Sequence, residues 1–339
     1  MSAATLPYHL RPHKAVDRRL FLDLLNRCER WRPLIRDAYL SMGAYPLEDH
    51  KLVHRMLGIS RLIAFDDDEN VVARQRFNRP VDTFRCFKRK SGELIDQLDQ
   101  ILNEAECADA EGLILWLDYT APSHLGEQVR EFETLLDKLK AGDIARITVN
   151  AHLPALGDGK GPDGKQITAD QLRQNRFDKL KTRIGDYLPS DAKPSDMTPE
   201  RLPLLISQAF GKAAGKALPV TGENTFAPLS VVRYSDGQQM LSMTGMVIPR
   251  TQKTELRSRL DLASWPFASN DWRTVHSLEV PDLTLRERLF LERAAATSDY
   301  GEVSEKLGFI FGGDMELGTF LQNYKDFYRF YPTLLSAEI

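Results

Sequence analysis

Short apolar segments alternate with amphipathic stretches through the first half of the chain, and this alternation limits the folds that the sequence can adopt. The apolar segments are 38–40, 62–65, 84–87, 113–117 and 144–149. Helical periodicity recurs between them, in 52–57, 93–102 and 129–139. Parallel neighbouring strands need a crossover of about a dozen residues or more, which is usually a helix. The pattern therefore predicts a doubly wound α/β fold with a mostly parallel sheet.

An Asp-Gly dipeptide further along the chain predicts that this sheet ends in an antiparallel hairpin. Asp236 and Gly237 separate two β-rich runs, 229–234 and 240–248. Glycine accepts the positive φ that a type I′ turn requires, so the dipeptide is a strong hairpin signal. Together with the five parallel strands, the hairpin gives a predicted sheet of seven strands.

These patterns divide the chain into three predicted parts. Residues 1–37 form an N-terminal helical segment, 38–250 the sheet domain and 251–339 a helical C-terminal region. Within the sheet domain, 155–198 is predicted to be an inserted lid, because the glycines of 157–164 favour a mobile loop and a basic helix follows. Such a lid can close over an anionic acceptor, or it can be a dispensable surface insertion.

Two local signals describe the C-terminal region. Thr284 and Glu287 have the spacing of a capping box, which predicts a helix start. An aromatic stripe at helical spacing suits core packing or a homodimer contact better than a ligand site; its members are Phe320, Tyr324, Phe327 and Tyr331.

Composition excludes several classes of protein. Lys+Arg 45 and Asp+Glu 48 give a net charge of −3, so the chain lacks the global field of a DNA-coating protein. No apolar run approaches the roughly 20 residues that span a bilayer, and the N-terminus lacks a secretory leader, so we expect a cytoplasmic protein without a membrane partner. The 3 cysteines are too few and too widely spaced for a disulfide framework or a zinc ribbon. No nucleophile elbow or P-loop is present, which leaves no basis for a hydrolase or an NTPase.

Three stretches of sequence carry a resemblance to a known family. They are Tyr39-Leu-Ser-Met-Gly-Ala-Tyr-Pro-Leu-Glu-Asp-His50, Leu57-Gly-Ile-Ser-Arg-Leu-Ile-Ala-Phe-Asp-Asp-Asp-Glu69 and Arg74-Gln-Arg-Phe-Asn-Arg-Pro80. With the closing 323–332 segment, they resemble a bacterial family described as "putative O-methyltransferase". The resemblance runs over most of the chain. It implies a Rossmann-like fold of the S-adenosylmethionine-dependent methyltransferase type, S-adenosyl-L-methionine as cofactor, and methyl transfer to an oxygen of an unidentified acceptor.

The first strand-to-helix turn is the predicted cofactor loop. In a doubly wound sheet the ligand lies beyond the carboxyl ends of the strands, where the strand order reverses. Ser41, Met42, Gly43 and Tyr45 occupy this turn and are predicted to contact the cofactor. The usual glycine-rich pattern is reduced to one glycine here. The alternative is therefore a tight turn in a fold that has lost its cofactor.

The end of the second strand supplies an acid for a ribose. Asp66 follows Gly43 by 66 − 43 = 23 residues, close to the spacing of about 20 at which an acid accepts hydrogen bonds from ribose hydroxyls. Asp67 and Phe87 complete the cofactor contacts that we predict on this side. The acidic run can equally begin the next helix, with Asp68 or Glu69 at the cap. It lacks partner ligands for a metal, and no residue is assigned to one.

The end of the fourth strand is predicted to face the transferred methyl group. Asp118 is a candidate general base or orienting group, and Asp118 and Tyr119 are also predicted cofactor contacts. His124 is a second candidate base, against the alternative of a solvent-exposed loop histidine. The segment differs from the Asp-Pro-Pro-Tyr type of nucleobase N-methylation. His50 and His54 share a helical face but lack the glutamate of a His-Glu-x-x-His zinc site, so we interpret them as ordinary helix residues.

A basic segment at 74–90 suggests a second class of function. Its basic residues are Arg74, Arg76, Arg79, Arg85, Lys88, Arg89 and Lys90. They can face a nucleic-acid or acidic protein partner, or form a solvated surface that protects a strand edge. The alternative to an enzyme is thus a catalytically silent methyltransferase-like module that binds a partner in a multi-protein bacterial system, a defence-related one included.

Overall fold

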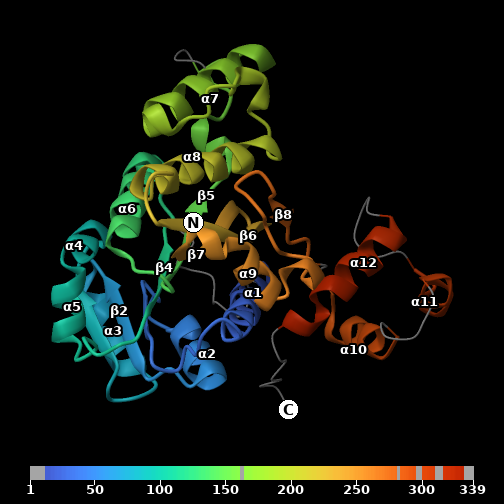
Figure 1. Cartoon of the computed structure of the whole chain (residues 1–339). Helices are drawn as coiled ribbons and strands as arrows, with labels where there is room; N and C mark the ends of the chain where they lie inside the picture. The colour runs from blue at the N-terminus through green and yellow to red at the C-terminus, as the bar shows by residue number, and fades with distance from the viewer. Residues whose placement is uncertain (1–11, 161–163, 281–282, 295–299, 310–315, 332–339) are drawn as a thin grey trace. The chain divides into compact units, whose positions relative to one another are not determined.

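A computed structural model of the chain describes residues 12–160, 164–280, 283–294, 300–309 and 316–331 (Figure 1). The chain divides into two compact units. The larger consists of Leu22–Arg233 and Gly237–His276, and the smaller of Met1–Phe21, Tyr234–Asp236 and Ser277–Ile339. The candidate cofactor residues all belong to the larger unit.

One mixed sheet organises the fold, as predicted, but within the described residues it has eight strands where the sequence predicted seven. In spatial order the strands are β3 (Arg85–Lys88), β2 (Arg61–Asp66), β1 (Ala38–Ser41), β4 (Leu113–Asp118), β5 (Ile144–Asn150), β7 (Gln239–Pro249), β6 (Asn224–Ser235) and β8 (His276–Ser277). The additional strand is β8. It is two residues long and polar, so no apolar alternation announces it.

The parallel half of the sheet and the terminal hairpin both agree with the sequence patterns. β1 pairs in parallel with β2 and with β4, β2 with β3, and β4 with β5. β7 runs antiparallel to β5, with Ile144 opposite Met246. β6 and β7 are neighbours joined only by residues 236–238, a connection too short for a parallel pair. The Asp-Gly hairpin prediction is therefore confirmed.

Helices lie in the connections between the strands, before β1 and after β8. They are α1 (Pro12–Cys28), α2 (Glu48–Leu57), α3 (Glu69–Asn78), α4 (Ser91–Asp96), α5 (Leu98–Glu104), α6 (Leu125–Lys138), α7 (Ala169–Ile184), α8 (Arg201–Ala217), α9 (Lys253–Arg259), α10 (Leu285–Ala294), α11 (Tyr300–Leu307) and α12 (Leu317–Phe327). The periodic stretch at 93–102 predicted a continuous helix. It is interrupted at Gln97, which ends α4 and begins α5.

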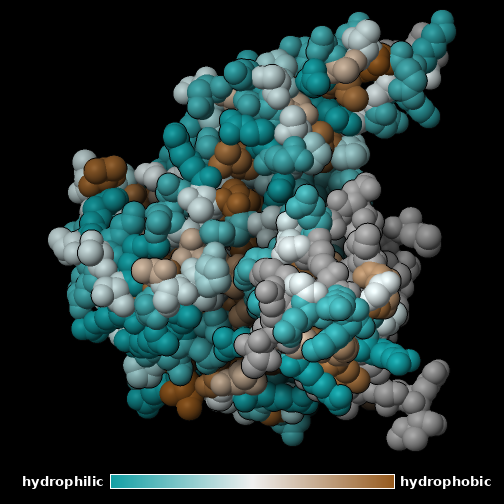
Figure 2. Space-filling model, turned by 90° about the vertical axis from the view of Figure 1, so that its right-hand side faces the viewer, coloured by the Kyte–Doolittle hydropathy of each residue, from teal (hydrophilic) through white to brown (hydrophobic). Residues whose placement is uncertain are grey.

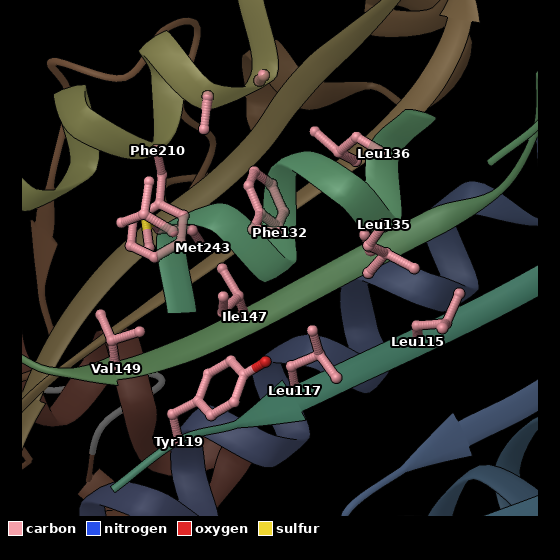
Figure 3. Packing of buried hydrophobic residues seen from close by; sticks show 14 of the residues in the cluster. Leu115, Leu117, Tyr119, Phe132, Leu135, Leu136, Ile147, Val149, Phe210 and Met243 are labelled. Atoms are coloured by element: carbon pink, nitrogen blue, oxygen red, sulfur yellow. The ribbon is translucent and has the colours of Figure 1, made fainter. Parts of the chain in front are cut away.

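The main hydrophobic core lies on one face of the sheet, against α6 and α8. Alternate residues of β4 and β5, among them Leu117 and Ile147, point toward Phe132 of α6 and Phe210 of α8 (Figure 3). The two phenylalanine rings meet edge to face at 5.3 Å between centroids. Alternation along each strand places the polar residues described below on the opposite face.

The inserted segment is docked on α6 through the C-terminal half of α7. Leu180 is buried, and a Cβ added to Gly126 of α6 would collide with the Arg183 carbonyl oxygen, so the two helices are in close contact. Arg176 donates two hydrogen bonds to the Gly157 carbonyl, at 3.1 and 2.8 Å. Residues 161–163 of the glycine-rich loop lie outside the described residues. A lid movement of α7 as a whole would have to break these contacts.

The predicted aromatic stripe packs inside the smaller unit. Phe320, Tyr324, Phe327 and Tyr331 are all buried, and the rings of Tyr324 and Tyr331 meet edge to face at 5.8 Å. The capping box of α10 is present, with the Thr284 backbone N–H donating to Glu287 at 2.7 Å. Both interpretations of this region as packing and helix initiation are confirmed.

The aspartate of the hairpin turn caps the first helix of the chain. Asp236 accepts hydrogen bonds from the backbone N–H groups of His13 (3.3 Å) and Lys14 (2.9 Å) at the start of α1. The His13 ring lies 3.1 Å from the same carboxylate. Burial alone would raise the pKa of Asp236, but these hydrogen bonds outweigh it and hold the pKa below its usual range.

An arginine ties together the amino ends of the central strands. Arg32 binds Asp37 with two hydrogen bonds, at 2.7 and 2.8 Å, and donates to the Gly142 carbonyl just before β5. A Cβ on Gly112, just before β4, would collide with this guanidinium. Burial raises the pKa of Asp37 despite the bonds from Arg32, so the carboxylate depends on its partner.

We predict that Asp236→Ala lowers the free energy of unfolding by about 1–2 kcal/mol at pH 7, because α1 loses its N-terminal cap. Since the folded-state pKa is depressed, the stabilisation is complete above the ordinary aspartate pKa of about 3.9 and is lost as the pH falls through the folded value. Urea unfolding at pH 7 and below pH 4 measures this difference. Asp236→Asn keeps an acceptor and a turn-compatible residue, so it should lose less. Equal losses for both variants at all pH values would contradict the cap.

We also predict that Arg32→Lys costs about 3 kcal/mol in the free energy of unfolding. Lysine cannot reproduce the two-pronged contact, so the buried Asp37 carboxylate is left poorly paired. The control is Arg36→Lys, whose exposed partner Glu111 lies 2.7 Å away in an ordinary surface ion pair. That control should cost less than about 1 kcal/mol. Comparable losses in the two variants would show that Arg32 is only a surface cation.

Candidate functional site

The strand order reverses at β1, and the predicted cofactor loop follows this strand. β2 and β3 extend the sheet from one side of β1, whereas β4 and β5 extend it from the other. Ligands of doubly wound sheets bind at such a switch point, beyond the carboxyl ends of the strands. The loop from Met42 to Leu47 occupies this position.

The pairing register brings three of the predicted residues to one face of this edge. Ser41 is level with Ala64 of β2 and Trp116 of β4, so Asp66 and Asp118 each lie two residues beyond it. Asp66 and Asp118 therefore flank the loop, separated by two strand spacings, or about 10 Å. The same parity directs Ser41, Asp66 and Asp118 to the face opposite the main core.

Two other predicted contacts lie on the core face instead. Phe87 is level with the core residue Phe65 and packs partly buried against the core. Tyr119 is buried, and its hydroxyl donates to Glu131 of α6. Burial, and then the Glu131 charge, raise the pKa of Tyr119 well above its usual value. Figure 3 shows the Tyr119 ring among the core side chains.

Hydrogen bonds from two side chains of α3 hold the loop, and the sequence did not predict them. Gln75, fully buried, donates to the carbonyls of Met42 (2.9 Å) and Ala44 (3.4 Å). Asn78 donates to the carbonyl of Tyr45 at 2.9 Å. A buried side-chain amide needs hydrogen-bond partners, but the burial of Gln75 follows only from the three-dimensional structure, so no local pattern in the sequence predicted these contacts.

Residues of the loop adopt backbone conformations that L side chains rarely take. Gly43 has φ +67°, which glycine accepts freely, but Ala44 has φ +39° and Leu47 has φ +55°. Left-handed backbone costs about 1–2 kcal/mol for a residue with a side chain. Such strain persists only where surrounding contacts determine the conformation, and it concentrates at functional sites.

Asp66 and Asp68 have different roles at the end of β2: Asp68 caps the next helix, and Asp66 binds the backbone of the turn between them. Asp68 caps α3, accepting from the backbone N–H groups of Asn70 (2.7 Å) and Val71 (3.3 Å). Asp66 Oδ1 accepts the Asp68 N–H at 2.9 Å. Burial, and then the charges of Asp67 and Asp68, raise the pKa of Asp66. Asp67 is exposed.

The two candidate bases differ in their surroundings. Asp118 ends β4 on the face opposite the main core and is half-buried. His124 lies in the turn Pro122–His124, is 58% exposed and contacts Glu127 at 2.8 Å. The rings of His50 and His54 lie 2.9 Å from the backbone carbonyls of Ile63 and Ile59, respectively, so each ring has a hydrogen-bond partner within the fold.

A buried polar layer continues from this edge across the sheet. The Trp116 indole donates to Thr148 Oγ1 at 3.0 Å, and the Arg146 guanidinium lies 4.6 Å from the Trp116 ring. Arg146 also donates to Thr244 of β7 at 2.8 Å. β4 is apolar on both faces, but Arg146, Thr148 and Asn150 alternate with apolar residues along β5, and this alternation was the available sequence signal for the layer.

Most of the predicted basic segment is paired within the chain. Four side chains form ion pairs: Arg76 and Lys88 with Glu69, Arg79 with Asp82, and Arg85 with Glu106. Arg74 stacks on the Tyr45 ring at 3.3 Å from its centroid. An acidic or nucleic-acid partner at this segment stays a prediction.

Figure 2 shows one side of the surface, where hydrophobic residues lie in small separate groups. Among the described helices, none is long and apolar enough to cross a bilayer.

Comparison with known proteins identifies the family. The chain belongs to the family described as "Putative O-methyltransferase", whose model matches residues 6–339. A search of curated proteins finds no match.

Several solved structures are similar to this chain. A SAM-dependent methyltransferase from Anabaena variabilis is 9% identical over 70% of this chain and 86% of that one, with a TM-score of 0.37. Geranyl diphosphate C-methyltransferase from Streptomyces coelicolor, in complex with Mg²⁺, geranyl diphosphate and S-adenosyl-L-homocysteine, is 12% identical over 67% and 77%, with a TM-score of 0.28. A variant of LepI, in complex with SAH and a substrate analogue, is 10% identical over 62% of this chain, with a TM-score of 0.30; the match spans 43% of that protein.

The strained loop gives a direct prediction. Ala44→Gly should raise the free energy of unfolding by about 0.5–1 kcal/mol, because glycine relieves the left-handed backbone. Ala73→Gly, at an exposed position of α3, should instead lower it by a similar amount, because glycine loses more entropy in a helix. Chemical denaturation compares the two variants. Destabilisation by both would mean that Ala44 does not adopt the positive φ.

Proposed function

We propose that this protein transfers a methyl group from S-adenosylmethionine to an oxygen nucleophile, with the cofactor at the loop after β1. The observation that carries the proposal is the placement of Asp66 and Asp118 on one face of the sheet, on either side of this loop at the switch point. Membership of the O-methyltransferase family supplies the reaction class.

The donor set at this edge fits the cofactor. Asp66 uses Oδ1 for the Asp68 N–H, and its partly buried carboxylate gains from further hydrogen-bond donors. The two vicinal hydroxyls of a ribose are such donors. Asp66 would hold the ribose, with the backbone of the loop beside it. The carbonyls of Met42, Ala44 and Tyr45 are already engaged by α3, so the loop is fixed in advance.

Methyl transfer requires the protein mainly to align the two reactants and to accept one proton from the acceptor. When bound, S-adenosylmethionine supplies an electrophilic methyl group on a sulfonium. Asp118 orients the acceptor hydroxyl and takes its proton, since it is half-buried on the same face as Asp66. His124 is less suited to this role, because it is exposed and bound to Glu127. Fixing the two reactants in line accounts for most of the acceleration.

Calorimetric titration with S-adenosylhomocysteine tests the cofactor site. We expect binding by the unaltered chain and an affinity about 10- to 100-fold lower for Asp66→Asn, which keeps the local turn but loses the charge-assisted hydrogen bonds. Asp137→Ala, an exposed acid near the end of α6, is the matched control and should bind like the unaltered protein.

Two results would overturn the proposal. One is no measurable binding by a folded protein at high concentration, which would favour the catalytically silent binding module. The other is equal affinity for the unaltered chain and Asp66→Asn, which would place the cofactor elsewhere.

A further inference from the structure

A buried polar cluster lies directly beneath the loop after β1, and the proposed chemistry does not use it. The Tyr39 hydroxyl donates to Asp49 Oδ2 at 2.7 Å, and the Ser41 hydroxyl donates to the same oxygen. Tyr39 and Ser41 are the alternate residues of β1 on the face opposite the main core, and Asp49 is in the first turn of α2. One carboxylate thus joins β1 to the helix after the loop. Burial, and then the Asp49 charge, raise the pKa of Tyr39 well above its usual value, so the phenol remains a donor.

The next residue of α2 makes a second connection, to the neighbouring strand. His50 is fully buried, and its Nε2 lies 2.9 Å from the Ile63 carbonyl of β2. A carbonyl only accepts, so Nε2 carries the proton. The ring is also packed between Tyr39, at 5.0 Å, and Phe84, at 4.8 Å between centroids. Its position is therefore fixed on several sides.

The loop rests on this histidine ring. A Cβ added to Gly43 would lie 2.6 Å from His50 Cε1 and 2.9 Å from Nδ1. Contacts that short are not tolerated, so the single glycine of the loop is required by the ring below it. The height of the loop above the strand ends is consequently limited by His50, whose own position is fixed by the Ile63 carbonyl and by the Tyr39 and Phe84 rings.

We propose that Asp49 and His50 are positioning residues that hold the loop from Met42 to Leu47 in the conformation that binds the cofactor. The inference rests on the proposed function for its ligand, but not for its geometry. Burial of a carboxylate costs desolvation free energy. Hydrophobic residues of similar volume often stabilise such a contact equally well, so stability alone does not account for Asp49. Hydrogen bonds are directional, whereas apolar contacts are not. A hydrogen-bonded cluster below the loop can therefore fix the orientation of the backbone above it.

Three variants separate positioning from general stability. Asp49→Ala removes the shared acceptor, Asp49→Asn keeps one acceptor in the same shape, and Glu48→Gln removes the neighbouring acid of the same helical turn without touching the cluster. We expect Asp49→Ala to lower the affinity for S-adenosylhomocysteine at least tenfold, Asp49→Asn to recover part of that loss, and Glu48→Gln to leave it unchanged.

Hydrogen exchange of the unliganded protein provides a readout that does not need the cofactor. In Asp49→Ala, the amides of residues 42–45 should exchange at least tenfold faster, while those of β4 and β5 keep their protection. If the unaltered chain binds no S-adenosylhomocysteine, the proposed function fails and this measurement still tests the positioning role. Unchanged exchange at 42–45, or an equal increase throughout the larger unit, would overturn the inference.

The contact between Gly43 and His50 gives an independent check through a double-mutant cycle. Gly43→Ala should weaken binding strongly in the unaltered background and less in a His50→Ala background, where the ring is absent. The backbone strain of alanine at φ +67° is common to both backgrounds and cancels. Additive effects of the two substitutions on affinity would show that the ring does not support the loop, and would count against the role of His50.

Discussion

Parallel pairing of β1 on both of its edges is the constraint on which the rest of the larger unit depends. All four residues of β1 are buried, and each has a partner on β2 and on β4. Because parallel neighbours cannot be joined by tight turns, the chain must leave this strand, cross a face of the sheet and return. From β1 the chain moves to β2 and β3 on one side, and after β3 it returns to β4 and β5 on the other side. The loop after β1 lies where these two halves of the sheet meet. The Arg32 contact at the amino ends and the Asp49 contact near the carboxyl ends hold the two ends of the same strand.

A glycine-poor loop at the switch point of a doubly wound sheet needs another source of precision. Glycine-rich loops reach the ligand because their backbone is unobstructed and free to adopt unusual angles. Here two of the left-handed positions are Ala44 and Leu47, and side chains from two helices hold the backbone in place. Gln75 and Asn78 bind the carbonyls from one direction, while the His50 ring supports Gly43 from another. Rigidity thus comes from outside the loop, which allows the loop sequence to depart from the common pattern.

Local signals in the sequence were sufficient for most of the fold. Apolar runs located all five parallel strands, Asp236 and Gly237 located the hairpin, and the acidic run after β2 contained the α3 cap. These features depend on residues close together in the chain, so periodicity and turn chemistry reveal them. The two-residue β8 has no such pattern, because its pairing is decided entirely by neighbouring structure.

The arrangement of the candidate site was only partly predictable for the same reason. Strand ends and spacing located Ser41, Asp66 and Asp118 at one edge. They did not reveal that Tyr119 is bound to Glu131 on the core face, because face assignment depends on which helices cover the sheet. Nor does any local pattern connect Gln75 with a loop 33 residues earlier. Buried polar contacts of this kind become visible only when the elements are placed in three dimensions.

The cap of α1 has a consequence for the order in which the chain acquires its structure. His13 and Asp236 are 223 positions apart, so the N-terminal helix emerges from the ribosome long before its capping group exists. Most of the stability of a helix in a protein comes from its tertiary contacts rather than from the helix itself. The first turn of α1 should therefore remain frayed through synthesis of the entire parallel sheet and become protected only when the β6–β7 turn has formed. The residues at the start of α1 would thus be made well before the sheet and yet reach their final hydrogen bonding after it.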